Sequence, residues 1–348
     1  MGAVYRSLIR PLLFRMDPEI AHEQGVGVLK FISDYSILCQ MTRLLFRPVR
    51  DQPVRAFGLE FPNPVGVAAG LDKNGVGVPA LEAMGFGFVE VGTVTPKGQP
   101  GNPQPRVFRY PRELALINRM GFNNEGAQAM AERLARTSPL SRRKVPIGVN
   151  IGKAKVTPLE QAIEDYLNAF DILSPHADFF VLNVSSPNTQ GLRDLQSKAA
   201  LGELCQAIQE ASRAKAARQN RKPWPVLLKI APDNSDSQLD DILEVLMDEE
   251  ISGVIATNTT IERPGFFESV EEAGGLSGKP LTARSTEIIR HIHKATGGRL
   301  PIIGVGGILT VDDAKEKLDA GACLIQVYTG FVYEGPGFPG MLARGLRA

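Results

Sequence analysis

The sequence reads Asn183-Val-Ser-Ser-Pro-Asn-Thr-Gln-Gly-Leu-Arg193 directly after a short apolar run, Phe179–Leu182. The run has the length and the boundaries of a buried strand. Pro187 interrupts a strand and Gly191 frees the backbone, so the quoted stretch is expected to form a loop. One such loop is ordinary, but other apolar runs of this chain also end in polar or glycine-rich loops. Polar groups after successive parallel strands are typical of an α/β barrel active site.

Eight apolar runs have the character of short buried strands. They are Pro64–Ala69, Phe86–Val94, Ile147–Ile151, Phe179–Val184, Val226–Ile230, Gly253–Thr257, Ile302–Val305 and Leu324–Tyr328. Helix-like segments separate most of them, one predicted to begin with a capping box at Thr157–Glu160 and another after Thr310-x-x-Asp313. This alternation predicts an α/β fold of the (β/α)8 TIM barrel type. A doubly wound open sheet is the alternative, although neither G-x-G-x-x-G after the first run nor G-x-x-x-x-G-K-[ST] is present.

Composition limits the possible functions. The 348 residues are 43% hydrophobic with a net charge of +1, which allows a large core and gives no general attraction to nucleic acid. Cys39, Cys205 and Cys323 lie far apart, so neither a disulfide framework nor a zinc site is predicted, and we expect no metal. The sequence contains no apolar run long enough to cross a bilayer and no cleavable signal pattern.

Residues 1–50 differ from the rest of the chain. They contain seven Lys or Arg residues and only four acidic residues, and apolar residues are mixed with the basic ones. Asp17 followed by Pro18 predicts the start of a helix. Two interpretations stand equal: a basic amphipathic helix pair on a membrane surface, or a helical lid packed on the main domain. We therefore divide the chain into residues 1–50 and a catalytic barrel, 51–348, whose core is not expected to need the first segment, with 51–58 as a linker.

Two features indicate a phosphorylated redox cofactor. Glycines follow the seventh and eighth runs, where barrels commonly bind phosphate. Lys229 interrupts the apolar run Val226–Ile230, and a buried lysine needs a negative partner. FMN would supply one, since negative charge develops near its N1 on reduction. A snorkelling or salt-bridged lysine is the alternative.

The same loops are rich in amide side chains, at Asn118, Asn123, Asn150, Asn183, Asn188 and Asn258. Such a set suits a planar heterocyclic amide or a sugar, and Lys73 could hold a carboxylate. Histidine is absent from these loops, so a proton-abstracting group would have to be a serine or a lysine.

Together these loops resemble the dihydroorotate dehydrogenases of the membrane-associated, quinone-linked class 2, and the resemblance covers essentially the whole chain. The motifs that carry it are Ala-Ala-Gly-Leu-Asp-Lys-Asn-Gly at 68–75, Asn-Arg-Met-Gly-Phe-Asn-Asn at 118–124, Asn-Val-Ser-Ser-Pro-Asn-Thr at 183–189, Ala-Thr-Asn-Thr-Thr at 256–260 and Gly-Gly-Leu-Ser-Gly at 274–278. The resemblance implies an FMN-binding barrel with an N-terminal helical extension for membrane association and quinone access. It also implies oxidation of dihydroorotate to orotate with quinone as acceptor, in de novo pyrimidine (UMP) biosynthesis.

The resemblance also implies roles for single residues. FMN would contact Ala69, Lys73, Thr93, Asn150, Asn183, Lys229, Thr257, Gly278, Gly307, Tyr328 and Thr329. Dihydroorotate would be held by Lys73, Asn118, Gly121, Phe122, Asn183, Asn188, Asn258 and Thr259. Ser186 matches the catalytic base, which takes a proton while a hydride passes to flavin N5, and cysteine stands there in class 1. His22 and Arg109 match positions near the quinone tunnel.

Further expectations from the family are peripheral attachment through residues 1–50 to the cytoplasmic face of the cell membrane, and no required protein partner. Two other functions stay open. A class 1-like soluble enzyme would use fumarate or NAD, but Ser186 and residues 1–50 count against it. A membrane-bound flavin scaffold without turnover is the other, and the presence of Ser186, Lys73 and the asparagines argues against it.

Overall fold

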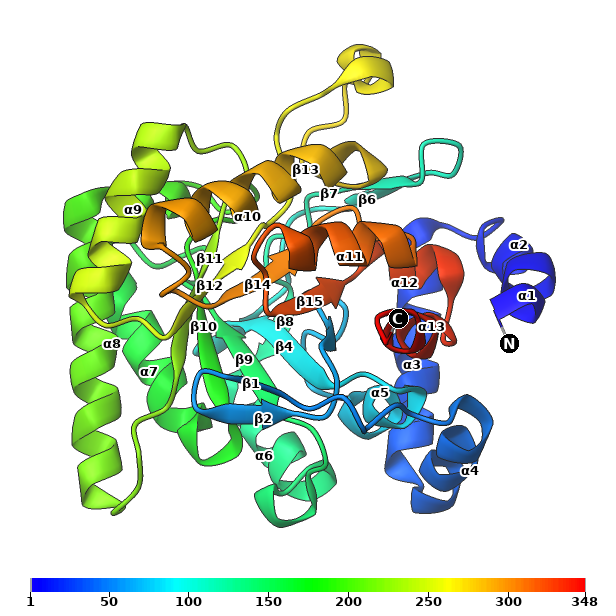
Figure 1. Ribbon diagram of the computed structural model, residues 1–348, viewed down its shortest axis with the longest axis horizontal. Helices are drawn as coiled ribbons and strands as arrows, with labels where there is room; N and C mark the ends of the chain where they lie inside the picture. Colours follow the sequence, from blue (N-terminus) through cyan, green and yellow to red (C-terminus); the bar gives the residue numbers. More distant parts are fainter. Residues whose placement is uncertain (1, 348) are drawn as a thin grey trace.

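The computed structural model describes residues 2–347, and its centre is a closed barrel of eight parallel strands (Figure 1). The strands are β3 (Val65–Val67), β4 (Phe88–Val94), β9 (Ile147–Ile151), β10 (Phe179–Asn183), β11 (Val226–Ile230), β12 (Gly253–Ala256), β14 (Ile302–Val305) and β15 (Leu324–Val327). Each neighbours its predecessor in the barrel order, and β15 closes the ring on β3. Every predicted run supplies one strand, so the TIM barrel prediction is confirmed.

Helices cover the outside of the barrel (Figure 1). They are α5 (Val78–Met84), α6 (Ala127–Thr137), α7 (Ala162–Leu173), α8 (Lys198–Arg218), α9 (Asp236–Asp248), α10 (Thr282–Thr296), α11 (Val311–Asp319), α12 (Thr329–Glu334) and α13 (Phe338–Gly345). The capping box of Thr310 and Asp313 at α11 is confirmed. The one predicted at Thr157 is wrong, because Pro158 is extended and a 3-10 turn, Leu159–Gln161, precedes α7 without a side-chain cap.

A short hairpin closes the amino-terminal end of the barrel. It consists of β1 (Val54–Ala56), which lies within the predicted linker 51–58, and β2 (Leu59–Phe61), which follows that linker. The ring of Phe61 is fully buried, with its centroid 5.3 Å from that of Phe88 and 6.4 Å from that of Phe179. These two rings start β4 and β10, so the hairpin plugs this end and leaves the carboxyl-terminal end for ligands.

Two small antiparallel sheets are inserted near the carboxyl-terminal end. One contains β6 (Val107–Tyr110), β7 (Ala115–Asn118) and β13 (Gly275–Gly278), and the other pairs β5 (Lys97–Gln99) with β8 (Asn124–Gly126). In Figure 1 the first of them lies in the upper part of the view, away from β1 and β2. Pairing of β7 with β13 brings Asn118 beside Gly275, so two of the sequence motifs meet here.

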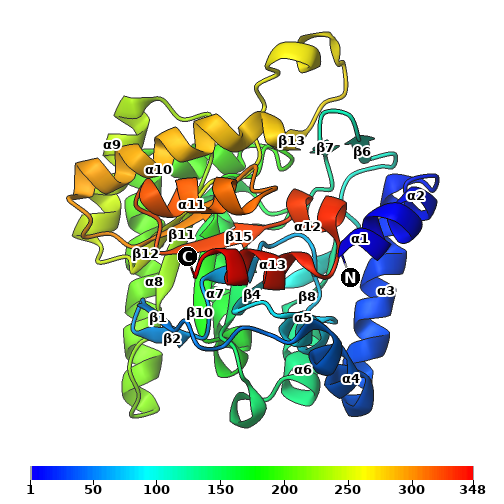
Figure 2. The ribbon, with the colours of Figure 1, turned by 45° about the vertical axis from the view of Figure 1, so that its right-hand side comes forward.

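The N-terminal segment is helical and lies against one side of the barrel (Figure 2). It contains α1 (Gly2–Val4), a π-helical turn at Tyr5–Ile9, α2 (Arg10–Leu13), α3 (Pro18–Asp34) and α4 (Ser36–Phe46). Asp17 caps α3 by accepting hydrogen bonds from the N–H groups of Glu19 and Ile20, at 2.9 and 3.1 Å. Leu29 of α3 is only 6% exposed and packs in the main core, so the segment contributes to that core. The expectation that the barrel core does not need the segment stays a prediction.

The outer surface of the same segment is strongly apolar. Most of the exposed large apolar side chains of residues 2–347 lie in it, namely Val4, Leu8, Ile9, Leu12, Met16, Ile20, Val28, Phe31, Tyr35, Ile37, Met41, Leu44 and Leu45. The segment therefore has the features of both interpretations, because one face packs on the barrel and the other is apolar and exposed. Over residues 2–347, no helix combines the length and the apolarity that crossing a membrane requires.

Candidate active site

A cavity opens at the carboxyl-terminal ends of the barrel strands, with about 1140 Å³ of empty space including its mouth. Nearly all residues that the sequence assigned to a cofactor or substrate line it: Ala69, Lys73, Thr93, Asn118, Gly121, Phe122, Asn183, Ser186, Asn188, Lys229, Thr257, Asn258, Thr259, Gly278, Gly307, Tyr328 and Thr329. Loops that are far apart in the sequence thus converge on a single space.

Asn150 does not line the cavity but supports the residues that do. It is completely buried, and its Oδ1 accepts hydrogen bonds from the hydroxyl of Thr93 and from Nδ2 of Asn183, the latter at 3.2 Å. Nδ2 of Asn183 also donates to the Thr93 hydroxyl at 2.8 Å. These contacts fix the orientation of two cavity-lining side chains.

A buried carboxylate that the sequence analysis missed lies at the centre of the barrel. Glu90 of β4 is fully buried and accepts hydrogen bonds from Asn150 Nδ2 at 2.6 Å and from Gln326 Nε2 at 2.7 Å. Nζ of Lys229 lies 3.5 Å from its Oε2 in an ion pair. Lys229 is therefore salt-bridged, and it also faces the cavity. Glu90 and Gln326 each interrupt an apolar run as Lys229 does, so the same signal could have found them.

Lys73 loses its proton more readily than an ordinary lysine. Its ammonium donates to the carbonyl oxygen of Gly70 at 2.8 Å. Burial, reinforced by the nearby positive charge of Arg106, lowers the pKa of Lys73 to about 8. A bound carboxylate would raise this pKa again, because an opposite charge favours the protonated amine.

Ser186 is buried within the loop after β10. Its Oγ accepts a hydrogen bond from the backbone N–H of Asn188 at 3.3 Å, and the side chain of Asn188 donates to the carbonyl oxygen of Asn118 at 3.1 Å. An N–H group aimed at this oxygen would stabilise negative charge that develops on it. The loop thus holds a hydroxyl and amide groups around one space.

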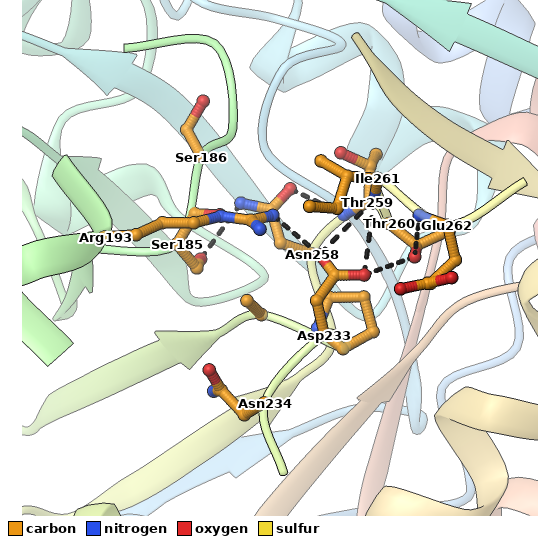
Figure 3. Close-up of polar contacts among 12 residues, drawn as sticks. Ser185, Ser186, Arg193, Asp233, Asn234, Asn258, Thr259, Thr260, Ile261 and Glu262 are labelled. Atoms are coloured by element: carbon orange, nitrogen blue, oxygen red, sulfur yellow. Dashed lines mark hydrogen bonds and ion pairs between the residues drawn. The ribbon is translucent and has the colours of Figure 1, made fainter. Parts of the chain in front are cut away.

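The loop after β12 lies beside the serine loop and also contributes to the cavity. Nδ2 of Asn258 donates to the hydroxyl of Ser185 at 3.0 Å, and its Oδ1 accepts from the N–H of Thr259 at 2.8 Å. Figure 3 shows these residues together with the Ser186 loop. These two hydrogen bonds fix the orientation of the Asn258 side chain and hold it beside the serine loop.

The two quinone-site candidates lie outside the cavity lining. Arg109 of β6 donates to the carbonyl oxygens of Leu13 and Met16, at 3.3 and 2.8 Å, and its guanidinium carbon lies 4.2 Å from the centroid of the Phe14 ring. His22 of α3 is close enough to Lys73 for their charges to interact, and burial with this repulsion lowers its pKa to about 3. His22 is therefore neutral near pH 7. Within residues 2–347 no cluster of three potential metal ligands occurs.

Comparisons with known proteins place the chain in a family. Residues 53–348 match the family described as dihydroorotate dehydrogenase. A curated protein of Chloroflexus aurantiacus named dihydroorotate dehydrogenase (quinone) is 52% identical, over 98% of this chain and 96% of its own length. A protein of the same name from Chromobacterium violaceum is 50% identical, over 97% of this chain and 96% of its own.

Solved structures agree with this result. The crystal structure of DHODH from Eimeria tenella in complex with ferulenol superposes with a TM-score of 0.85 at 38% identity, over 95% of this chain and 90% of that one. The ligand-free form superposes with a TM-score of 0.83. The barrel, the converging motifs and the near full-length identity lead to one conclusion: the chain belongs to the dihydroorotate dehydrogenase family, alongside members named as the quinone-dependent type.

Proposed function

We propose that the protein oxidises dihydroorotate to orotate with FMN as cofactor and a membrane quinone as electron acceptor, in de novo pyrimidine (UMP) biosynthesis. The observation that carries the proposal is the convergence of Ser186, Lys73 and the asparagine side chains on one cavity. The names of the relatives, which cover almost the whole chain, support it.

The cavity residues fit FMN. Oε1 of Gln326 is buried and has no hydrogen-bond partner within residues 2–347, so it suits a ligand N–H group. Gly306, Gly307 and Gly330 line the cavity with backbone and no side chain, which suits a phosphate. Lys229 adds a cation beside the cavity. FMN, when bound here, would accept the hydride from the substrate at its N5.

The residues around Ser186 would bind the substrate and move one proton. The amides of Asn118, Asn188 and Asn258 would pair with the ring amide groups of dihydroorotate, and the Lys73 ammonium with its carboxylate. Ser186 Oγ, in its deprotonated form, would take the proton from C5 and so return to the neutral hydroxyl. The N–H of Asn188 would stabilise the negative charge on that oxygen, which is one way to make a weak base effective.

The role of Lys73 makes substrate binding dependent on pH. Since the pKa of Lys73 is lowered to about 8, the free site is cationic below pH 8 and becomes neutral above it. We expect the dissociation constant of orotate to rise by up to about tenfold per pH unit above 8, because binding must then return a proton to the amine. Titration of the flavin absorbance with orotate would measure this. Lys73→Met should bind weakly at every pH, and a slope retained in that variant would contradict the assignment.

The pairing of Lys229 with Glu90 changes what a substitution at Lys229 tests. Lys229→Met leaves a buried carboxylate uncompensated, which costs about 3–5 kcal/mol of stability. Adding Glu90→Gln should restore much of that stability, since both charges are then gone. We expect the double variant to remain slow in flavin reduction by dihydroorotate, because the cation beside the cavity is missing. Thermal unfolding and stopped-flow absorbance would check this, and a wild-type rate in the double variant would make Lys229 purely structural.

Residues 1–50 would serve the membrane and the quinone. Support comes from their exposed apolar surface and their excess of basic residues. Within the proposal the protein sits peripherally on the cytoplasmic face of the cell membrane, His22 and Arg109 lie near the quinone path, and no protein partner is required.

One measurement tests the proposed function as a whole. Anaerobic dihydroorotate should bleach the flavin band of the purified protein, and a quinone should restore it. A protein without a flavin band, or one whose band is unaffected by dihydroorotate, would contradict the proposal. Faster reoxidation by fumarate or NAD than by quinone would favour the class 1-like alternative.

A further inference from the structure

We infer that the ion pair of Arg193 and Asp233 is a positioning device for the reaction, which ties the loop carrying Ser186 to the loop after β12. The inference rests on the proposed function. Arg193 ends the polar stretch after β10, and Asp233 lies in the turn after β11 (Figure 3). Nη2 of Arg193 lies 2.8 Å from Oδ2 of Asp233, not aligned as a hydrogen bond, and the side chains are 24% and 8% exposed.

Arg193 acts on the serine loop through its backbone. Its Nε donates to the carbonyl oxygen of Ser185 at 3.1 Å. Ser185 directly precedes Ser186, so this contact holds the peptide that leads into the proposed base. The Ser186 side chain points away from the ion pair (Figure 3), and neither charged residue lines the cavity. The pair therefore acts through other residues and is not itself catalytic.

Asp233 acts on the loop after β12. Its Oδ1 accepts hydrogen bonds from the hydroxyl of Thr260 and from the N–H of Ile261, the latter at 3.2 Å. Thr260 directly follows Asn258 and Thr259, which line the cavity. One carboxylate thus contacts both loops, which lie side by side and each contribute side chains to the cavity.

The turn that carries Asp233 is itself anchored. Arg284 of α10 donates to the carbonyl oxygens of Pro232 and Asn234, at 3.1 and 2.9 Å. The side chain of Asn234 donates to Oε1 of Gln196, near the end of the serine loop, at 3.1 Å. A fixed turn makes Asp233 a fixed reference point, so loss of the ion pair would let the serine loop shift relative to Asn258.

A small shift of this kind has a large effect on rate. Displacement of a reacting group by about 1 Å can cost about a hundredfold. We therefore expect Asp233→Asn to lower the rate of flavin reduction at saturating dihydroorotate by about ten- to a hundredfold. Flavin content and reoxidation of the dithionite-reduced protein by quinone should stay within about twofold of wild type, since those steps do not use Ser186. The rate of flavin reduction in Arg193→Lys should lie between those of wild type and Asp233→Asn, because lysine keeps the positive charge but not the Nε donor.

The chain offers a matched control at the other end of β10. Arg143 and Asp178 form an ion pair at 2.9 Å, with side chains 7% and 22% exposed. Asp178 directly precedes β10, far from the Ser186 loop. Asp178→Asn should cost stability, as Asp233→Asn does, and leave the rate of flavin reduction unchanged. A rate loss no greater in Asp233→Asn than in Asp178→Asn would overturn the inference.

The decisive comparison is made in the Ser186→Ala background. If the pair acts by placing Ser186, Asp233→Asn should change the remaining rate by less than about threefold there. A loss by the same factor in both backgrounds would show a general structural role and overturn the inference. If Ser186→Ala alone keeps nearly the wild-type rate, the proposed base fails instead, so the two failures are distinguishable.

Discussion

Ser186→Ala will retain its FMN and lose about a hundred- to ten-thousandfold in the rate of flavin reduction by dihydroorotate. The physical reason is that Ser186 lines the cavity and its Oγ accepts the N–H of Asn188, which would stabilise negative charge on that oxygen. Removal of the oxygen leaves FMN and substrate binding in place but no group to take the proton. Stopped-flow absorbance at saturating substrate measures this step apart from quinone chemistry.

Cysteine at the same position provides the control. Ser186→Cys keeps a group that can accept a proton, and a thiol ionises more readily than a hydroxyl. We expect this variant to reduce its flavin faster than Ser186→Ala does. The ratio of the two rates should increase as the pH rises. If Ser186→Ala reduces its flavin within a few-fold of wild type, Ser186 is not the base.

Replacing Ile37, Met41 and Leu44 with serine will lower the partition coefficient of the protein onto anionic phospholipid vesicles by about a thousandfold. The three side chains share one face of α4 at helical spacing and are 60%, 58% and 76% exposed. Burial of each is worth about 1.5–3 kcal/mol, so insertion of all three is worth about 4.5–9 kcal/mol, and the low end of this range corresponds to about a thousandfold. Reduction of a long-tailed quinone should fall with vesicle binding, while flavin reduction by dihydroorotate should not.

A triple substitution elsewhere controls for apolar surface in general. Leu140, Val156 and Ile261 are 50%, 90% and 51% exposed and lie outside the N-terminal segment. Serine at these three positions should leave vesicle binding unchanged. If the two triple variants lost vesicle binding equally, α4 would have no specific role in membrane binding. Point substitutions are preferable to deletion of residues 2–46, because deletion would also uncover the core at Leu29 and remove Glu19 from its buried pair with Arg106.

The barrel strands could be predicted because each is a continuous apolar run with clear ends, and a parallel strand buried on both faces has that pattern. The hairpin β1–β2 could not, since each strand has three residues and one exposed position among them. The pairing of β7 with β13 joins Asn118 to Gly275, a contact between distant residues that no local pattern encodes. The false capping box at Thr157 shows that a motif fails when the proline within it stays extended.

The candidate site also has parts that could be predicted from the sequence and parts that could not. Its polar loops were visible because they follow the strands, and a barrel brings such loops together. The partners of those loops were not visible. Glu90 meets Lys229 across the barrel interior, and Arg193 meets Asp233 between two loops, so each pair depends on a geometry that appears only when the barrel closes.

The closure of the barrel has a consequence for how the protein is made. Val65 of β3 pairs with Ile325 of β15, so the first and last barrel strands meet only when every residue between them is available. Tyr5 adds a contact of the same kind, because its hydroxyl donates to the carbonyl oxygen of Val332 at 2.7 Å. Contacts between residues so distant in sequence slow folding, since a large loop must close before they form. The ring therefore cannot close before β15 has been synthesised, and until then the edge of β3 that will pair with β15 stays open to aggregation.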